Sequence, residues 1–107
     1  MKQVLVFASI VSALLSSLPT AASAAIVQAT GQIQGPRIES GVAIFSVGAF
    51  GSGCGSRAWV DLSTSAGRAS YNTALIAFAM GRAVAVRVNT DDPKVFGECK
   101  LYDIAIV

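Results

Sequence analysis

The sequence predicts a mainly β domain: a small, partly open barrel of five strands with one helix, preceded by an export signal. Three observations predict it. Residues 1–24 have the pattern of a signal peptide, five later segments have strand character, and one segment carries helix start and stop signals. With 107 residues, 53% of them hydrophobic and 13% charged, the chain suits one domain and is too apolar for intrinsic disorder.

The amino-terminal segment has the three regions of a secretory signal. Lys2 supplies the positive charge, an apolar run covers residues 4–15, and Ala22-Ser23-Ala24 is a small-x-small cleavage site. The alternative is a membrane anchor, but a span needs about 20 apolar residues and this run is shorter. We expect cleavage after Ala24, which leaves residues 25–107 as a secreted or periplasmic domain with no membrane span.

The charge balance of residues 25–107 argues against two classes of partner. Lys2 leaves with the signal, so seven basic and six acidic residues remain and the net charge is +1. Proteins that bind nucleic acid or anionic membranes through electrostatics need a clear basic excess. We therefore expect neither partner.

Strand signals occur in five segments. Alternation and β-branched residues predict strands over residues 26–34, 42–50, 57–62, 83–89 and 100–107. Gly35-Pro36 is expected to end the first strand, and a glycine-rich turn follows the second. That glycine-rich run lacks a following helix and a Gly-Lys-Ser/Thr ending, so a phosphate-binding loop is not expected.

A single helix is predicted over residues 66–80. Ser63-Thr64-Ser65 offers side-chain oxygens that can cap its start, and Gly81 can end it in a left-handed conformation. Tyr71, Leu75 and Phe78 repeat at i, i+4 and i+7, which predicts that they form the buried stripe. The order βββαββ is that of an OB-fold, a partly open Greek-key barrel that a helix plugs at one end; another α+β sandwich is the alternative.

The two cysteines predict a staple for this small domain. Exported proteins meet oxidising conditions, so a disulfide between Cys54 and Cys99 is the expectation, with free or intermolecular thiols as the alternative. The bond would link the turn before the third strand to the start of the fifth.

Most enzyme chemistry lacks its residues here. The sequence contains no histidine, which removes Ser-His and Cys-His nucleophiles and the commonest transition-metal ligand. Its six carboxylates show no spacing that calls for catalysis. We expect no catalytic residues, no metal and no cofactor.

One stretch of the sequence resembles a known family. Residues 65–87 are similar to the central helix and following strand of subtilase-cytotoxin B-subunit-like proteins, a group in which a Tyr-Asn-x-Ala-Leu helix leads into Gly-x-x-Val-x-Val. A similar pattern occurs in small uncharacterised secreted proteobacterial proteins. The matching positions are Tyr71, Asn72, Ala74, Leu75, Gly81, Val84 and Val86. The resemblance implies an OB-fold, and toxin B-subunits of this type form pentameric rings that bind host glycans.

The expected function is that of a non-catalytic binding module. The resemblance implies an oligosaccharide or glycoprotein ligand and a homo-oligomer, and OB-folds bind ligands on the face of their second and third strands and on adjoining loops. Trp59 and Tyr102 are aromatics on which a sugar could stack, although core packing is the more ordinary role of each. The candidate ligand-binding residues are Arg37, Glu39, Arg57, Trp59, Asp91 and Asp92.

The alternative is an envelope structural or interaction protein without a small ligand. Its supporting feature is the helix, which has no charged residue from Ala69 to Met80. A surface helix of a monomer normally has a charged face, so this helix is either covered within the domain or packs against a partner.

Overall fold

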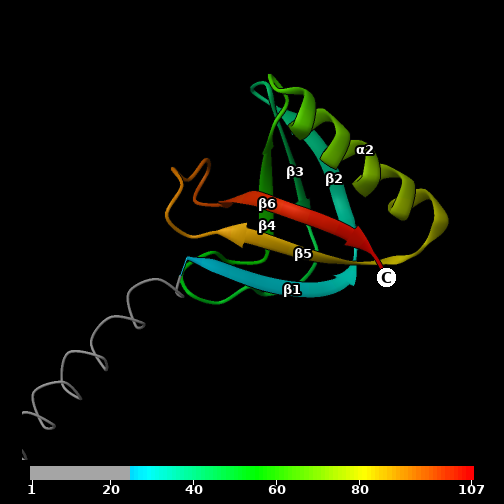
Figure 1. Ribbon diagram of the computed structural model, residues 1–107, viewed down its shortest axis with the longest axis horizontal. Coiled ribbons are helices and arrows are strands. Elements are labelled where there is room, and N and C mark those ends of the chain that lie inside the picture. Colours follow the sequence, from blue (N-terminus) through cyan, green and yellow to red (C-terminus); the bar gives the residue numbers. More distant parts are fainter. Residues whose placement is uncertain (1–24) are drawn as a thin grey trace, which may run out of the picture.

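The computed structural model describes residues 25–107 (Figure 1). The signal-peptide prediction for residues 1–24 lies outside this range. The described chain contains six strands and one helix, in the order β1 (Ile26–Gln32), β2 (Gln34–Glu39), β3 (Val42–Ser46), β4 (Arg57–Asp61), α2 (Ser65–Met80), β5 (Ala83–Asn89) and β6 (Cys99–Ile106).

All six strands belong to one mixed sheet that curls into a partly open barrel. Their order across the sheet is β1-β5-β6-β4-β3-β2, and every neighbouring pair is antiparallel except β4 and β6, which are parallel. The two outermost strands, β1 and β2, are consecutive in the chain and only Ile33 separates them, so the two ends of the curled sheet meet at this residue. The predicted mainly β fold, an OB-fold-like, partly open barrel with one helix, is confirmed, although the sheet has six strands and the helix lies between β4 and β5.

The first strand differs from the prediction. Gly35-Pro36 does not end it; both residues lie within β2, which makes the sheet six-stranded. Proline lacks an amide hydrogen and is tolerated on an edge strand, and β2 is an edge. The ladder with β3 shifts register between Gln34 and Arg37, so the proline sits at the irregularity. The second predicted strand is also shorter and ends at Ser46.

The helix begins and ends where its capping residues predict. The Thr64 hydroxyl accepts a hydrogen bond from the Gly67 amide, and Gly81 takes the left-handed conformation with φ of 66°. Its buried face agrees with the prediction only at Tyr71: Tyr71, Ala74 and Ala77 are buried, whereas Leu75 and Phe78 are 38% and 48% exposed. Because Ala74 and Ala77 are small, the backbone of α2 packs close to the sheet. The larger Leu75 and Phe78 side chains then lie at the edge of the contact between helix and sheet.

The core lies between the helix and the inner face of the curled sheet. Phe45, Val60 and the alternating valines of β5 fill it, together with the buried half of the helix. The helix packs mainly on β6 and β4. The disulfide between Cys54 and Cys99 is present and wholly buried, as predicted, and it links the β3–β4 connection to the start of β6. Such a bond indicates an oxidising, extracytoplasmic compartment.

Candidate functional site

A buried aromatic lies on the outer face of the sheet. Along β4, Ala58 and Val60 point into the core, so Arg57, Trp59 and Asp61 point outward. Trp59 is nevertheless only 7% exposed. Its indole Nε1 donates a hydrogen bond to the Pro93 carbonyl at 3.2 Å, and the Lys100 ammonium lies 5.4 Å from its ring centre. The β5–β6 connection therefore rests on Trp59.

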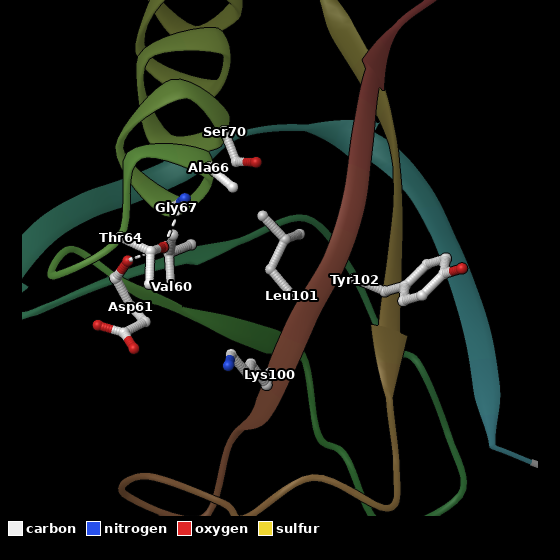
Figure 2. Close-up of a pocket in the computed structure, with 9 residues that line it drawn as sticks. All are labelled: Val60, Asp61, Thr64, Ala66, Gly67, Ser70, Lys100, Leu101 and Tyr102. Atoms are coloured by element: carbon white, nitrogen blue, oxygen red, sulfur yellow. Dashed lines mark hydrogen bonds between the residues drawn. The ribbon is translucent and has the colours of Figure 1, made fainter.

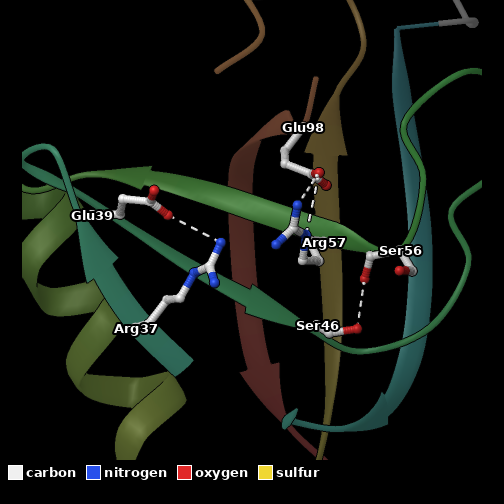
Figure 3. A network of polar contacts seen from close by, with 6 residues as sticks. All are labelled: Arg37, Glu39, Ser46, Ser56, Arg57 and Glu98. Carbon is white, nitrogen blue, oxygen red and sulfur yellow. Dashed lines mark hydrogen bonds and ion pairs between the residues drawn. The ribbon is translucent and has the colours of Figure 1, made fainter. Parts of the chain in front are cut away.

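Arg57, two residues before Trp59, also points outward from β4, and it binds the same β5–β6 connection. Its Nε and Nη2 both donate to Oε1 of Glu98, at 3.2 and 2.9 Å. Figure 3 shows this pair at the start of β4, next to the hydrogen bond from the Ser46 hydroxyl to the Ser56 carbonyl. Glu98 is mostly buried, and a partly desolvated, doubly hydrogen-bonded pair of this kind fixes geometry.

The six predicted binding residues separate into two groups. Arg57 and Trp59 contact the β5–β6 connection, which also contains Asp91 and Asp92. Arg37 and Glu39 lie on the edge strand β2 and form an exposed ion pair of 3.0 Å with each other (Figure 3). Four of the six candidates are thus gathered around one loop.

A pocket opens where β4 and β6 separate. Only Ala58–Cys99 and Trp59–Lys100 are paired between these strands, so the two strands diverge beyond Trp59. The start of α2 lies across the gap and leaves a pocket of about 160 Å³ (Figure 2). Its lining consists of Val60, Asp61, Thr64, Ala66, Gly67, Ser70, Lys100, Leu101 and Tyr102.

The walls of this pocket carry opposite charges and hydroxyl groups. Asp61 Oδ1 accepts hydrogen bonds from both the hydroxyl and the amide of Ser63, at 2.6 and 2.9 Å. These bonds, with a smaller contribution from the positive charge of Lys100, hold the pKa of Asp61 below its ordinary value. The pocket lining thus combines an acidic residue, Asp61, a basic residue, Lys100, and the hydroxyl-bearing Ser70 with the apolar Val60 and Leu101.

Tyr102 projects from a β-bulge. Val88 pairs with Leu101 and Arg87 pairs with Asp103, so Tyr102 is the extra residue of β6. Its side chain is 57% exposed, and the Arg87 guanidinium lies 5.3 Å from the ring centre. Figure 2 shows the ring pointing away from the Asp61 side of the pocket. Sequence periodicity could not find this placement, because a bulge interrupts the alternation that assigns side chains to faces.

The fold and this surface define a small, disulfide-bonded, partly open β-barrel domain with a pocket of mixed polar and apolar lining at a strand divergence. Comparison with known proteins adds no relative: no family model, curated protein or solved structure matches the chain. In the part of the chain that the structure describes, no helix is both long and apolar enough to cross a bilayer, and no group of three or more His, Cys, Asp or Glu side chains could hold a metal ion.

Proposed function

We propose that this protein is an exported, non-catalytic binding module that recognises an oligosaccharide. The observation that carries the proposal is the pocket between β4, β6 and α2, whose walls combine Asp61, Lys100 and Ser70. A sugar hydroxyl both donates and accepts hydrogen bonds, and this set of groups complements it on both counts.

The dimensions of the site agree with a small polar ligand. The pocket is smaller than the roughly 300–1,000 Å³ typical of drug-sized ligands, so it suits one ring of an oligosaccharide whose remainder lies on the surface. Tyr102 and Arg87 extend the outer surface from β6 onto β5. An exposed aromatic ring offers the C–H face of a pyranose a flat apolar partner.

The disulfide supports an exported location, and the signal-like sequence of residues 1–24 makes the secreted or periplasmic space the expected destination. The resemblance of residues 65–87 to toxin B-subunits points to glycans as well. Fold and resemblance do not fix a ligand by themselves, so the proposal depends on the pocket.

A glycan array probed with the purified, disulfide-bonded protein tests the proposal. We expect signal from a defined set of oligosaccharides and a loss of at least about tenfold for Lys100→Gln and Tyr102→Ser, because each removes a group from the site. Ile106→Ser alters an exposed apolar residue at the far end of the same strand and serves as the matched control. An array without any glycan signal from the wild-type protein would rule out the proposed function.

The second candidate is an envelope structural or interaction protein without a small ligand. Exposed apolar side chains on α2 favour it: Ile76 and Met80 are 53% and 60% exposed, in addition to Leu75 and Phe78. Surfaces of this kind mark protein contacts. Light scattering distinguishes the two candidates, since a stable oligomer that Ile76→Glu dissociates supports the second, and a monomer at all concentrations argues for the first.

A further inference from the structure

The turn between β5 and β6 holds a phenylalanine in a left-handed backbone conformation. Phe96 and Gly97 have φ of 53° and 78°, and they lie between Val95 and Glu98, which exchange two backbone hydrogen bonds of 3.2 and 2.9 Å. Positive φ at both central residues defines a type I′ turn, which favours Asn, Asp or Gly at the first central position. A bulky aromatic there is unfavourable for the backbone.

Two other turns provide an internal comparison. Ser40-Gly41 and Ser52-Gly53 have nearly the same φ values as Phe96-Gly97, and both have serine where the third has phenylalanine. Core packing does not account for the difference, because Phe96 is 51% exposed. Neither the turn nor the core thus explains the aromatic ring. Strained residues of this kind are concentrated at binding sites.

The turn is held rigidly from both sides. Pro93 is hydrogen-bonded to Trp59, Glu98 is paired with Arg57, and Cys99 is bonded to Cys54. In Figure 1 the connection that carries it projects from one end of the sheet. A half-exposed ring on a tethered turn loses less conformational entropy when a ligand binds than a ring on a free loop would.

Polar groups flank the turn. Arg57 occupies Oε1 of Glu98, while Oε2 faces the glycine-rich β3–β4 connection, 3.8 Å from where a side chain at Gly55 would begin. The Lys94 ammonium faces the same connection: a β-carbon at Gly53 would lie 3.7 Å from its Nζ. Of the two, Lys94 is exposed, whereas the Glu98 side chain is only 11% exposed and is held by Arg57.

We propose that Phe96 is a stacking platform for a neutral sugar residue, with the exposed Lys94 of the same connection donating a hydrogen bond to its hydroxyls. This inference rests on the proposed oligosaccharide-binding function and adds a contact point outside the pocket. A single ring among polar groups matches a pyranose, which has one apolar face and polar edges, better than a protein surface, which buries several apolar residues together. Asp91 and Asp92 in the same connection add negative charge, which disfavours acidic sugars.

The Phe96→Asn substitution distinguishes the effect of the aromatic ring on binding from its effect on the stability of the turn. Asparagine suits a type I′ turn, so the melting temperature should rise by a few degrees, while affinity for the neutral oligosaccharide with the strongest array signal falls at least about tenfold. Phe96→Trp keeps a larger ring and should retain affinity. Ser40→Asn is the matched control: it introduces the same residue in the same turn conformation, between β2 and β3, and should leave affinity unchanged.

Calorimetric titration and thermal unfolding of the purified protein provide both readouts. Equal binding by wild type and Phe96→Asn would overturn this inference and leave the proposed function standing. A fall in both affinity and melting temperature would also overturn it, because the ring would then have a structural role. Array signal restricted to acidic glycans would overturn the choice of a neutral sugar, and an array with no signal would overturn this inference together with the proposed function.

Discussion

Gly67 shows how a single residue fixes the position of the helix against the sheet. A β-carbon at this position would lie 1.8 Å from the Asp61 carbonyl oxygen, far inside van der Waals contact. The absence of a side chain lets the first turn of α2 approach the end of β4, and the pocket lies between these elements. Gly31 in β1 has a similar role, because a β-carbon there would lie 2.4 Å from the Val47 carbonyl oxygen.

Gly67→Ala should therefore destabilise the protein although alanine favours helices. The clash is with backbone, which moves only by displacing α2 or β4, and overpacking of this kind costs about 1–3 kcal/mol. Urea unfolding measures the loss. Asn72→Ala, an exposed change on the same helix, should stay within about 0.5 kcal/mol of wild type. Equal stability of Gly67→Ala and wild type would show that the contact is looser than described.

Among single residues, the sequence indicated the caps of α2 correctly, because Thr64 and Gly81 act through local backbone geometry. It could not indicate Gly67, since a close approach to Asp61 depends on the packing of two elements. Burial was the more ordinary expectation for Trp59 and is confirmed, but the sequence could not show that the ring is buried beneath Lys100 on the outer face of the sheet.

At the scale of elements, the β5–β6 ladder carries a pair of charges on its outer face. The Arg87 Nε donates to Asp103 Oδ1 at 2.8 Å, and its Nη2 donates to Oδ2. These hydrogen bonds hold the pKa of Asp103 below its ordinary value of 3.8 and raise the pKa of Arg87. The two residues are paired directly across the strands, where opposite charges stabilise a sheet.

The pH dependence of stability follows from the lowered pKa. The folded state holds the Asp103 carboxylate more strongly than the unfolded chain does, so its contribution is complete above pH 4 and is lost as the pH falls through the lowered value. Asp103→Asn should flatten the loss of stability below pH 4, and Arg87→Gln should flatten it similarly. Thermal unfolding from pH 2 to 7 measures both; an unchanged slope in Asp103→Asn would contradict this assignment.

The elements themselves were largely predictable, and their boundaries show why some details were not. Strict alternation of Val84, Val86 and Val88 located β5 correctly. Gly35-Pro36 was wrongly expected to end a strand, because a local breaker signal contains no information about edges. The predicted buried stripe of α2 was wrong for Leu75 and Phe78, because side-chain size does not reveal which face approaches the sheet.

At the scale of the whole molecule, the disulfide joins two segments that are 45 residues apart in the sequence and adjacent in the fold. It links the β3–β4 connection to the first residue of β6, beside the single parallel ladder of the sheet. The cross-link restricts the unfolded chain and holds the β3–β4 connection against the start of β6. A small barrel with a modest core gains much from such a bond.

Replacing both cysteines by alanine should lower the free energy of unfolding by up to about 4 kcal/mol, the chain-entropy value for a loop of this length. Guanidinium unfolding of wild type, of the double variant and of wild type with reductant measures it. We expect the last two to coincide. A double variant as stable as the oxidised protein would show that the barrel does not depend on the bond.

The overall architecture was predictable because element order, the cysteines and the capping signals all agree with one barrel. The arrangement of the candidate site was predictable only in part. Four of the six candidate residues gather around the β5–β6 connection, but the pocket and the Tyr102 bulge arise from strand divergence and register. These features depend on three-dimensional pairing and leave no local pattern in the sequence.

Saturation-transfer NMR of the purified protein with a panel of neutral oligosaccharides tests the central claim most directly. We predict magnetisation transfer to the ring protons of at least one sugar in the panel. The Tyr102→Ser/Phe96→Asn double variant should lose that transfer, and Ile106→Ser should keep it. No transfer to any member of the panel, or equal transfer with the double variant, would contradict the claim that this outer surface binds sugar.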